Sequence, residues 1–288
     1  MNILSATEAP VPLSTLIVPL MLGSGAATAA AIGLFRRKSI VGPSRIEKDE
    51  PLEPLVISMG VGMMVYFLGV AFGGIGGGAT TQPATEPVIT ETGQLVNLVS
   101  LVAGDLVMFI VLILLYRGIR RLGMSPDRLP RGIVSGLVGL LIVVPVMILA
   151  MAATLKMLNP QEEHLHPSLK LLTTTQDEAG RDVIMVSILA AAPVSEEFFF
   201  RACLQTLLGG WVARMKPLWP DARARWMAVI FTSLIFALAH GLPWEMPPIF
   251  VLSLCLGYAY ERTGNIWTSI TIHAAFNGWQ LWMFQYLK

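Results

Sequence analysis

Long apolar segments recur along this chain, each close to the length of a helix that spans a membrane. A transmembrane helix needs about 20 predominantly apolar residues. The segments lie at about 14–35, 54–75, 95–116, 132–155, 183–208, 226–242, 246–261 and 265–286. The pattern predicts an all-α, polytopic membrane protein of about eight transmembrane helices. Two of the later segments are short, and the loop "LPWEMPP" between them is compatible with a tight turn or a re-entrant bend.

Basic residues alternate between the predicted loops, and this alternation indicates an orientation. Lys and Arg gather in the odd-numbered loops, whereas the alternate loops hold only Lys156, Lys170 and Arg181. Cytoplasmic loops of membrane proteins carry an excess of Lys and Arg. We therefore predict that the odd loops are cytoplasmic and that both termini lie on the opposite side.

The composition agrees with a membrane protein. The chain is 54% hydrophobic and only 14% charged, whereas soluble domains carry about 25% charged residues. A net charge of +1 gives no overall field that would attract nucleic acid. Cys203 and Cys255 lie in apolar stretches, where cysteine usually acts as a small buried hydrophobe. We expect neither a disulfide framework nor a cysteine-based metal site.

Pairs of glycines four residues apart predict close helix packing. Gly69 and Gly73 form one pair, and Gly132 and Gly136 form another. Small residues at this spacing let the backbones of two helices approach closely within a membrane. We expect each pair to lie at a helix–helix contact.

Strongly polar residues interrupt the later apolar segments. The stretch "SEEFFFRACLQ" places Glu196, Glu197 and Arg201 inside the fifth predicted span, His240 ends the sixth, and His273 and Asn277 lie in the eighth. A charge at the bilayer centre costs at least about 2.5 kcal/mol, so such residues are usually paired or functional. Asp105, alone in the third span, is interpreted as a contact between helices.

Helical spacing brings these polar groups onto common faces. Glu197 and Arg201 are four apart, with the acid first, which favours an ion pair within the helix. Glu196 is rotated by about 100° from Glu197 and can point elsewhere. His273 and Asn277 share one face, and His240 shares a face with Phe236. The three segments together predict one polar catalytic cavity in the C-terminal half.

Such a set of groups is suited to hydrolysis. A carboxylate beside imidazoles can activate water as a general base or can ligate a divalent metal ion. An amide and an imidazole can stabilise a developing oxyanion. The expected reaction is hydrolysis of a peptide bond or a related acyl bond. Ser195 and Cys203 lie nearby but have no base partner at motif spacing.

Three ordered motifs resemble those of a known family. "EEFFFR" fits EExxxR, "FALAH" fits FxxxH and "HAAFN" fits HxxxN. In this order they resemble the CPBP intramembrane proteases, a group that contains eukaryotic Ras-converting CAAX endopeptidases and bacterial bacteriocin-processing or immunity relatives. The motifs cover about residues 183–286. The chain is accordingly divided into N-terminal transmembrane helices with an outer loop, 1–180, and protease-like catalytic helices, 181–288.

The resemblance implies roles for individual residues. Glu196 would activate water with help from His240, while His273 and Asn277 would stabilise the oxyanion or hold the water. Glu197 and Arg201 would order the site. Glu196, His240 and His273 are candidate ligands of a zinc ion, Zn²⁺, which the set permits without requiring it. Because two His and two Glu converge, we favour hydrolysis that needs a metal, by a metalloendopeptidase. The expected setting is the bacterial cytoplasmic membrane, with membrane lipid and a peptide or lipoprotein substrate as partners, no nucleic acid and no indicated oligomeric state.

Two other functions compete with an intramembrane endopeptidase. The same fold could serve as a catalytically idle immunity or scaffold protein, a reading that loss of a motif residue would favour. Alternatively, Asp105, Glu196 and Arg201 could form the ion relay of a transporter. Transporters often contain two related halves, whereas here the polar residues crowd into one half. The sequence does not define the substrate or show a groove for a prenyl tail.

Overall fold

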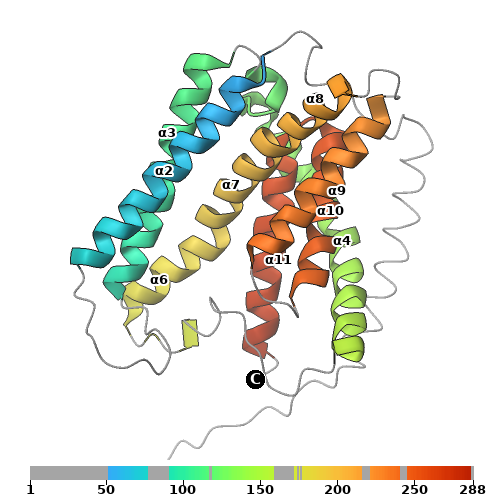
Figure 1. Cartoon of the computed structure of the whole chain (residues 1–288). Helices are drawn as coiled ribbons and strands as arrows, with labels where there is room; N and C mark the ends of the chain where they lie inside the picture. The colour runs from blue at the N-terminus through green and yellow to red at the C-terminus, as the bar shows by residue number, and fades with distance from the viewer. Residues whose placement is uncertain are drawn as a thin grey trace, which may run out of the picture.

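The computed structural model describes residues 51–76, 91–116, 119–158, 172–173, 175, 177–215, 221–240 and 245–286. The elements in these ranges are helices (Figure 1), which confirms the all-α prediction. In chain order they are α2 (Glu53–Gly76), α3 (Glu91–Leu115), the 3-10 turns η1 (Ile119–Leu122) and η2 (Pro126–Arg128), α4 (Leu129–Leu158), α6 (Glu178–Val186), η3 (Ser187–Ala191), α7 (Ala192–Glu197), η4 (Phe198–Gln205), α8 (Thr206–Met215), α9 (Asp221–Ala239), α10 (Met246–Thr263) and α11 (Ile266–Tyr286). The predicted span 14–35 lies outside the described residues.

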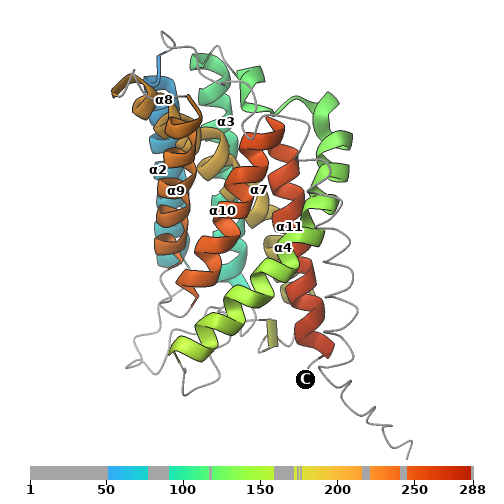
Figure 2. The same cartoon turned by 90° about the vertical axis from the view of Figure 1, so that its right-hand side faces the viewer.

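One unbroken helical run, here called the central run, crosses the middle of the molecule. It comprises α6, η3, α7, η4 and α8, with η3 and η4 wound as π-helix. The antiparallel pair α2 and α3 packs on one side of this run, and α4, α9, α10 and α11 gather on the other (Figures 1 and 2). The predicted fifth span, 183–208, is therefore the central part of a longer helix, 178–215.

Within the described residues, four helical segments are long and apolar enough to cross a membrane: Glu53–Phe72, Val96–Leu115, Arg120–Thr154 and Glu178–Met215. The helices α9, α10 and α11 occupy the predicted positions 226–242, 246–261 and 265–286, but they are not long and apolar enough to count among these four segments. They carry the polar side chains that the site requires, among them His240 at the end of α9 and His273 and Asn277 in α11. The protein is a polytopic membrane protein, and the count of eight spans stays a prediction.

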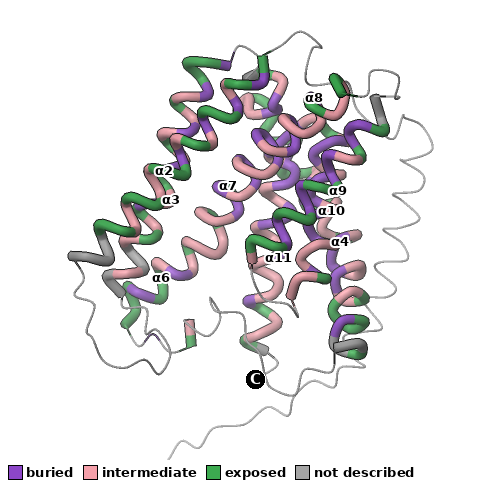
Figure 3. Tube along the Cα trace, viewed as in Figure 1, coloured by how far each residue is buried: buried purple, intermediate pink, exposed green. Residues whose placement is uncertain are grey.

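The outer helices expose apolar side chains, as expected for contact with lipid. Phe72 in α2, Leu114 in α3 and Leu149 in α4 are each at least 70% exposed. Buried residues concentrate instead along the central run and on α9, α10 and α11 (Figure 3). Large exposed apolar faces mark surfaces that are covered by a membrane or a partner. The most buried part of the protein therefore surrounds the polar motifs.

Glycines bring helices into close contact at three of the positions that the spacing predicted, Gly69, Gly132 and Gly136. A Cβ atom at Gly69 would collide with Ser100 of α3, and one at Gly132 would collide with Trp267 of α11. At Gly136 an added Cβ would lie 2.5 Å from the Cβ of Thr271, well inside van der Waals contact. The pair Gly132 and Gly136 therefore lets α4 pack directly against α11, the helix that carries His273 and Asn277.

The turn between α10 and α11 is locked to the connection before α4. Gly264 ends α10 in the left-handed conformation, with φ of 63°, a conformation that glycine adopts without steric cost. Its carbonyl accepts a hydrogen bond from Arg128 Nη1 at 3.1 Å. The side chain of Asn265 donates to the carbonyl of Arg128 at 2.9 Å, and the Tyr260 hydroxyl donates to the carbonyl of Leu122 at 3.0 Å. These contacts fix where α11 begins.

We predict that residue 120 and the C-terminus lie on opposite sides of the membrane. The connection 119–128, the end of α8, the start of α9 and the end of α10 lie at one end of the molecule, whereas α11 ends at the other (Figure 1). The first of these ends carries Arg120, Arg214, Arg223 and Arg262, which favours the cytoplasm. A single cysteine at exposed position 120 and another appended after Lys288 should differ in labelling by an impermeant thiol reagent applied to intact cells. Labelling of both from the same side would contradict this topology.

Candidate active site

The two glutamates lie where the central run changes its winding. Glu196 and Glu197 end α7, and π-helices precede and follow α7. Pro193 lacks the N–H that an α-helix would pair with the carbonyl of residue 189, and its ring crowds that carbonyl. A wider π turn relieves the conflict, and such turns occur frequently at functional sites. The local sequence thus explains a distortion directly before the acidic pair.

Glu197 is the buried centre of an ion-paired network. Its side chain is 0% exposed, and its Oε2 lies 3.1 Å from Arg201 Nε, at ion-pair distance, although the N–H is not aligned for a hydrogen bond. Its other oxygen, Oε1, lies 3.1 Å from Nδ1 of His273. An ionised carboxylate can only accept, so Nδ1 carries the proton in this contact. Glu197 therefore holds both the guanidinium of its own helix and the imidazole of α11.

Arg201 is held on three sides. It is fully buried, its Nη2 donates to Ser253 Oγ at 3.1 Å, and its guanidinium carbon lies 4.9 Å from the centre of the Phe236 ring. A cation over an aromatic face is favourable, especially where water is excluded. Arg201 thus links the central run to α10 through Ser253 and to α9 through Phe236, as well as to Glu197.

Glu196 faces His273 from the other side. Its Oε2 lies 3.8 Å from His273 Nε2, and no donor among the described residues hydrogen-bonds to this buried oxygen. The Glu196 side chain is 28% exposed, in contrast to Glu197. One imidazole therefore lies between two adjacent carboxylates, bonded to one through Nδ1 and directed towards the other through Nε2.

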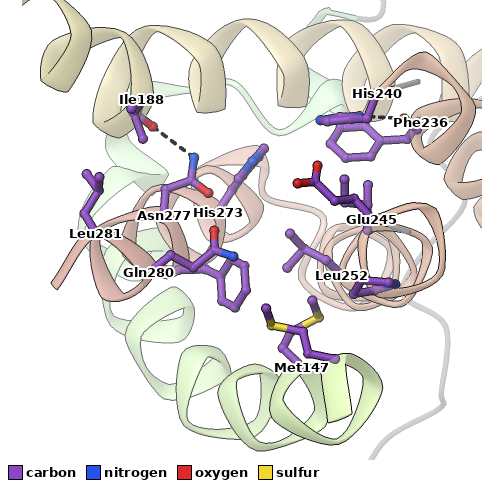
Figure 4. Close-up of a pocket in the computed structure, with 14 residues that line it drawn as sticks. Met147, Ile188, Phe236, His240, Glu245, Leu252, His273, Asn277, Gln280 and Leu281 are labelled. Atoms are coloured by element: carbon purple, nitrogen blue, oxygen red, sulfur yellow. Dashed lines mark hydrogen bonds between the residues drawn. The ribbon is translucent and has the colours of Figure 1, made fainter. Parts of the chain in front are cut away.

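His240 closes the end of α9. Its Nδ1 lies 2.8 Å from the carbonyl oxygen of Phe236, which can only accept, so Nδ1 is the donor. The centre of the Phe236 ring lies 4.6 Å from the centre of the His240 ring and 6.1 Å from the centre of the His273 ring (Figure 4). Phe236 therefore packs against both imidazoles and the Arg201 guanidinium.

Asn277 is anchored to the π-helix. Its Nδ2 donates to the carbonyl of Ile188 in η3 at 2.9 Å (Figure 4). This bond ties the second half of the HxxxN motif to the central run. The amide nitrogen keeps a second hydrogen, and the amide oxygen keeps its acceptor capacity. Asn277 can therefore position α11 and still contact a bound molecule.

Four of the predicted residues, Glu196, His240, His273 and Asn277, line two cavities rather than one, and the buried Glu197 and Arg201 line neither. The first, here called the α10/α11 cavity, has a volume of about 170 Å³ and is lined by His240, Glu245, His273, Asn277 and Gln280 among others. Its labelled polar side chains point inward (Figure 4). The second, the α2/α3 cavity, has about 430 Å³ and is lined by Tyr66, Asp105, Ser195, Glu196 and His240 among others. His240 belongs to both linings, and the short gap between Glu196 and His273 lies where the two cavities approach each other.

The described residues contain no group of three or more His, Cys, Asp or Glu side chains arranged to hold a metal ion. The predicted zinc ligands Glu196, His240 and His273 thus do not form a ready metal centre, although both imidazoles use Nδ1 for protein contacts and leave Nε2 for another partner. Zinc binding stays a prediction.

Several contacts of the site were not predicted. The bond between Glu197 and His273 links residues 76 apart in sequence, and the spacing indicated only the pairing of Glu197 with Arg201. Ser195 of α7 donates to Asp105 Oδ1 of α3 at 2.9 Å, which confirms the predicted contact between helices at Asp105. The place of both residues in the lining of the α2/α3 cavity was not predicted. Glu245 lines the α10/α11 cavity and was not predicted. The sequence does show an acidic residue in the apolar loop "LPWEMPP", which begins two residues after His240.

The comparisons with known proteins concern the C-terminal part of the chain. Residues 181–279 match the family model described as Type II CAAX prenyl endopeptidase Rce1-like, which confirms the predicted resemblance over this part. The UPF0177 protein YaiF of Lactococcus lactis subsp. lactis (strain IL1403) is 33% identical over 95 residues, which cover 33% of this chain and 36% of that protein. The match thus spans about a third of each protein. No solved structure matches the chain.

Proposed function

We propose that this integral membrane protein, whose residues 181–279 match the Rce1-like endopeptidase family, is an intramembrane endopeptidase. Its expected substrate is a membrane-associated or lipidated protein, and its expected reaction is hydrolysis of a peptide bond by water that Glu196 activates. The family match supports the class of reaction. The geometry around Glu196 and His273 supports Glu196 as the residue that activates water, with His273 rather than the predicted His240 as its partner.

The observation that carries the proposal is the 3.8 Å separation between Glu196 Oε2 and His273 Nε2. The imidazole proton is on Nδ1, where Glu197 holds it, so Nε2 is an acceptor when the ring is neutral. Two acceptors at this separation can each take one hydrogen of the same water molecule. The lone pairs of that water would then point away from both groups, towards a substrate carbonyl.

The reaction follows from this arrangement. Glu196 takes a proton from water as the oxygen attacks the carbonyl carbon, and the carbonyl oxygen becomes an oxyanion. The second hydrogen of the Asn277 amide, and His240 when it is protonated, are the donors that can stabilise this charge. The proton held by Glu196 then passes to the amide nitrogen as the carbon–nitrogen bond breaks. The products are a carboxylic acid and an amine.

The surrounding residues hold the reacting groups in place. Glu197 fixes the tautomer and orientation of His273, and Arg201 balances the charge of Glu197 in a fully buried position. Orientation of this kind lowers the cost of reaching the reactive geometry. Phe236 excludes water from one side because it is 1% exposed and packs against both imidazoles.

The test is cleavage of a mixed library of peptides and lipopeptides by the purified protein in detergent, read by mass spectrometry. We expect abundant products with wild-type protein and at least about 100-fold less with Glu196→Gln protein. We also expect a chelator to leave cleavage largely intact, because the water is activated by side chains. Loss of cleavage with chelator and its recovery with zinc would instead favour the predicted metal site. A wild-type protein that cleaves no member of the library would favour the idle immunity or scaffold function.

A further inference from the structure

We propose that Asp105 is a specificity-determining residue that favours a substrate with a positively charged side chain beside the scissile bond. This inference rests on the proposed endopeptidase function and names the substrate segment that enters through the α2/α3 cavity. It gives a function to a residue outside the three sequence motifs and outside the part of the chain that the family model covers.

The position of Asp105 is the first support. It lies in α3 and lines the same cavity as Glu196. Ser195, the residue directly before Glu196, donates its hydroxyl to Asp105 Oδ1 at 2.9 Å. This bond fixes the carboxylate close to the water-activating glutamate and leaves Oδ2 for another donor. A substrate that places its carbonyl near Glu196 therefore brings its neighbouring side chain near Asp105.

The charge balance of the cavity is the second support. Its described lining contains two carboxylates, from Asp105 and Glu196, one imidazole, from His240, and no Lys or Arg. The described residues provide no cation within ion-pair distance of Asp105, whereas Glu197 has Arg201. A carboxylate within a membrane is costly unless it is paired. A cationic side chain of the substrate would supply the missing partner, and an acidic side chain would be repelled by two like charges.

The shape of the cavity is compatible with a lysine or arginine side chain. Its volume is about 430 Å³, and Tyr66, Phe67, Phe199 and Phe200 belong to its lining. Long basic side chains bury their methylene stems on apolar surface and keep the charged end with polar groups. Aromatic faces also attract a cation. The cavity thus offers an apolar wall for the stem and a carboxylate for the charge.

Binding tests this inference without any need for turnover. Purified Glu196→Gln protein in nonionic detergent is titrated with two short fluorescent peptides of alanine and leucine, one with a central lysine and one with a central glutamate. The substitution removes the charge of Glu196 and leaves Asp105 as the carboxylate of the cavity. We expect the lysine peptide to bind about tenfold more tightly, a modest value for a charge pair at an interface.

Matched variants assign the preference to Asp105. Adding Asp105→Asn should remove most of the difference between the two peptides, and Asp105→Glu should preserve it. Asp182→Asn, in an exposed position on α6 of the same protein, should leave the difference unchanged. If Asp105→Asn protein fails to fold, the lysine–glutamate comparison and the Asp105→Glu variant still decide the question.

The outcomes separate this inference from the proposed function. Equal binding of the two peptides in protein that retains Asp105 would overturn it, even if cleavage depends on Glu196. A loss of affinity that is the same for both peptides in Asp105→Asn protein would also overturn it, because the role would then be structural through Ser195. Cleavage that persists at the wild-type rate in Glu196→Gln protein would instead reject the assigned role of Glu196, and a wild-type protein that cleaves no peptide would reject the endopeptidase function; the binding preference can be measured in either case.

Discussion

Replacing Glu196 with glutamine is expected to lower the rate of peptide cleavage by about 10²–10⁴-fold, the usual contribution of a general base. Glutamine keeps nearly the same volume and can still hydrogen-bond, but its amide cannot accept a proton from water. The Glu196 side chain is partly exposed to the α2/α3 cavity and has no ion-pair partner as close as the one that Arg201 gives to Glu197. The substitution should therefore leave the fold intact, so the loss should appear in kcat.

The control for this variant is Glu178→Gln, because Glu178 is an exposed glutamate in the same helical run. Both proteins should elute alike from a sizing column and unfold at similar temperatures, and only Glu196→Gln should lose activity. Cleavage of a confirmed substrate at the wild-type rate by Glu196→Gln protein would show that the assigned mechanism is wrong, with or without a metal.

Replacing Arg201 with alanine is expected to destabilise the protein by about 3–5 kcal/mol, the range for breaking a buried ion pair by removing one partner. Arg201 and Glu197 are both 0% exposed, so little solvent screening reduces the effect. The variant also loses the hydrogen bond to Ser253 and the contact with Phe236. Activity should fall as well, since an unbalanced Glu197 no longer holds His273 in the same protonation state.

Thermal unfolding in detergent measures this prediction. Arg214→Ala, which alters an exposed arginine later in the same run, should unfold close to wild type. A double variant, Glu197→Gln with Arg201→Met, should regain part of the lost stability because it leaves no uncompensated buried charge. It should not regain activity. If Arg201→Ala unfolds like wild type while activity is lost, then the role of Arg201 is chemical rather than structural.

The positions of the helices along the chain could be predicted from the local sequence pattern. Which helices pack against each other could not. Runs of about 20 apolar residues predicted the positions of α2, α3, α4, the central run and α9 to α11. The glycine pair at 132 and 136 correctly marked a close contact, because a missing side chain is visible in sequence. The partner helix was not visible, since spacing within one segment carries no information about which other segment packs against it.

In the candidate site, contacts within one helix could likewise be predicted from the sequence, whereas contacts between helices could not. The spacing of four residues predicted the Glu197–Arg201 pair, which the structure contains. The Glu197–His273 bond depends on how α11 packs against the central run, so no local pattern could supply it. The π-helices also escaped prediction, because the pattern of apolar residues over 187–205 is compatible with a regular α-helix. The predicted contact between helices at Asp105 is confirmed by its hydrogen bond with Ser195 of α7, whereas the cavity that Asp105 also lines depends on how the helices pack.

The shared position of His240 has a consequence for chemical inhibition. Its ring belongs to the walls of both cavities, one on the side of α2 and α3 and one on the side of α10 and α11. A small inhibitor can therefore reach the same imidazole from two directions. Two compounds designed independently for the two cavities are expected to antagonise each other wherever both require that ring. A single compound that passes beside it and fills both cavities would avoid this competition and would gain affinity from having its two ends linked.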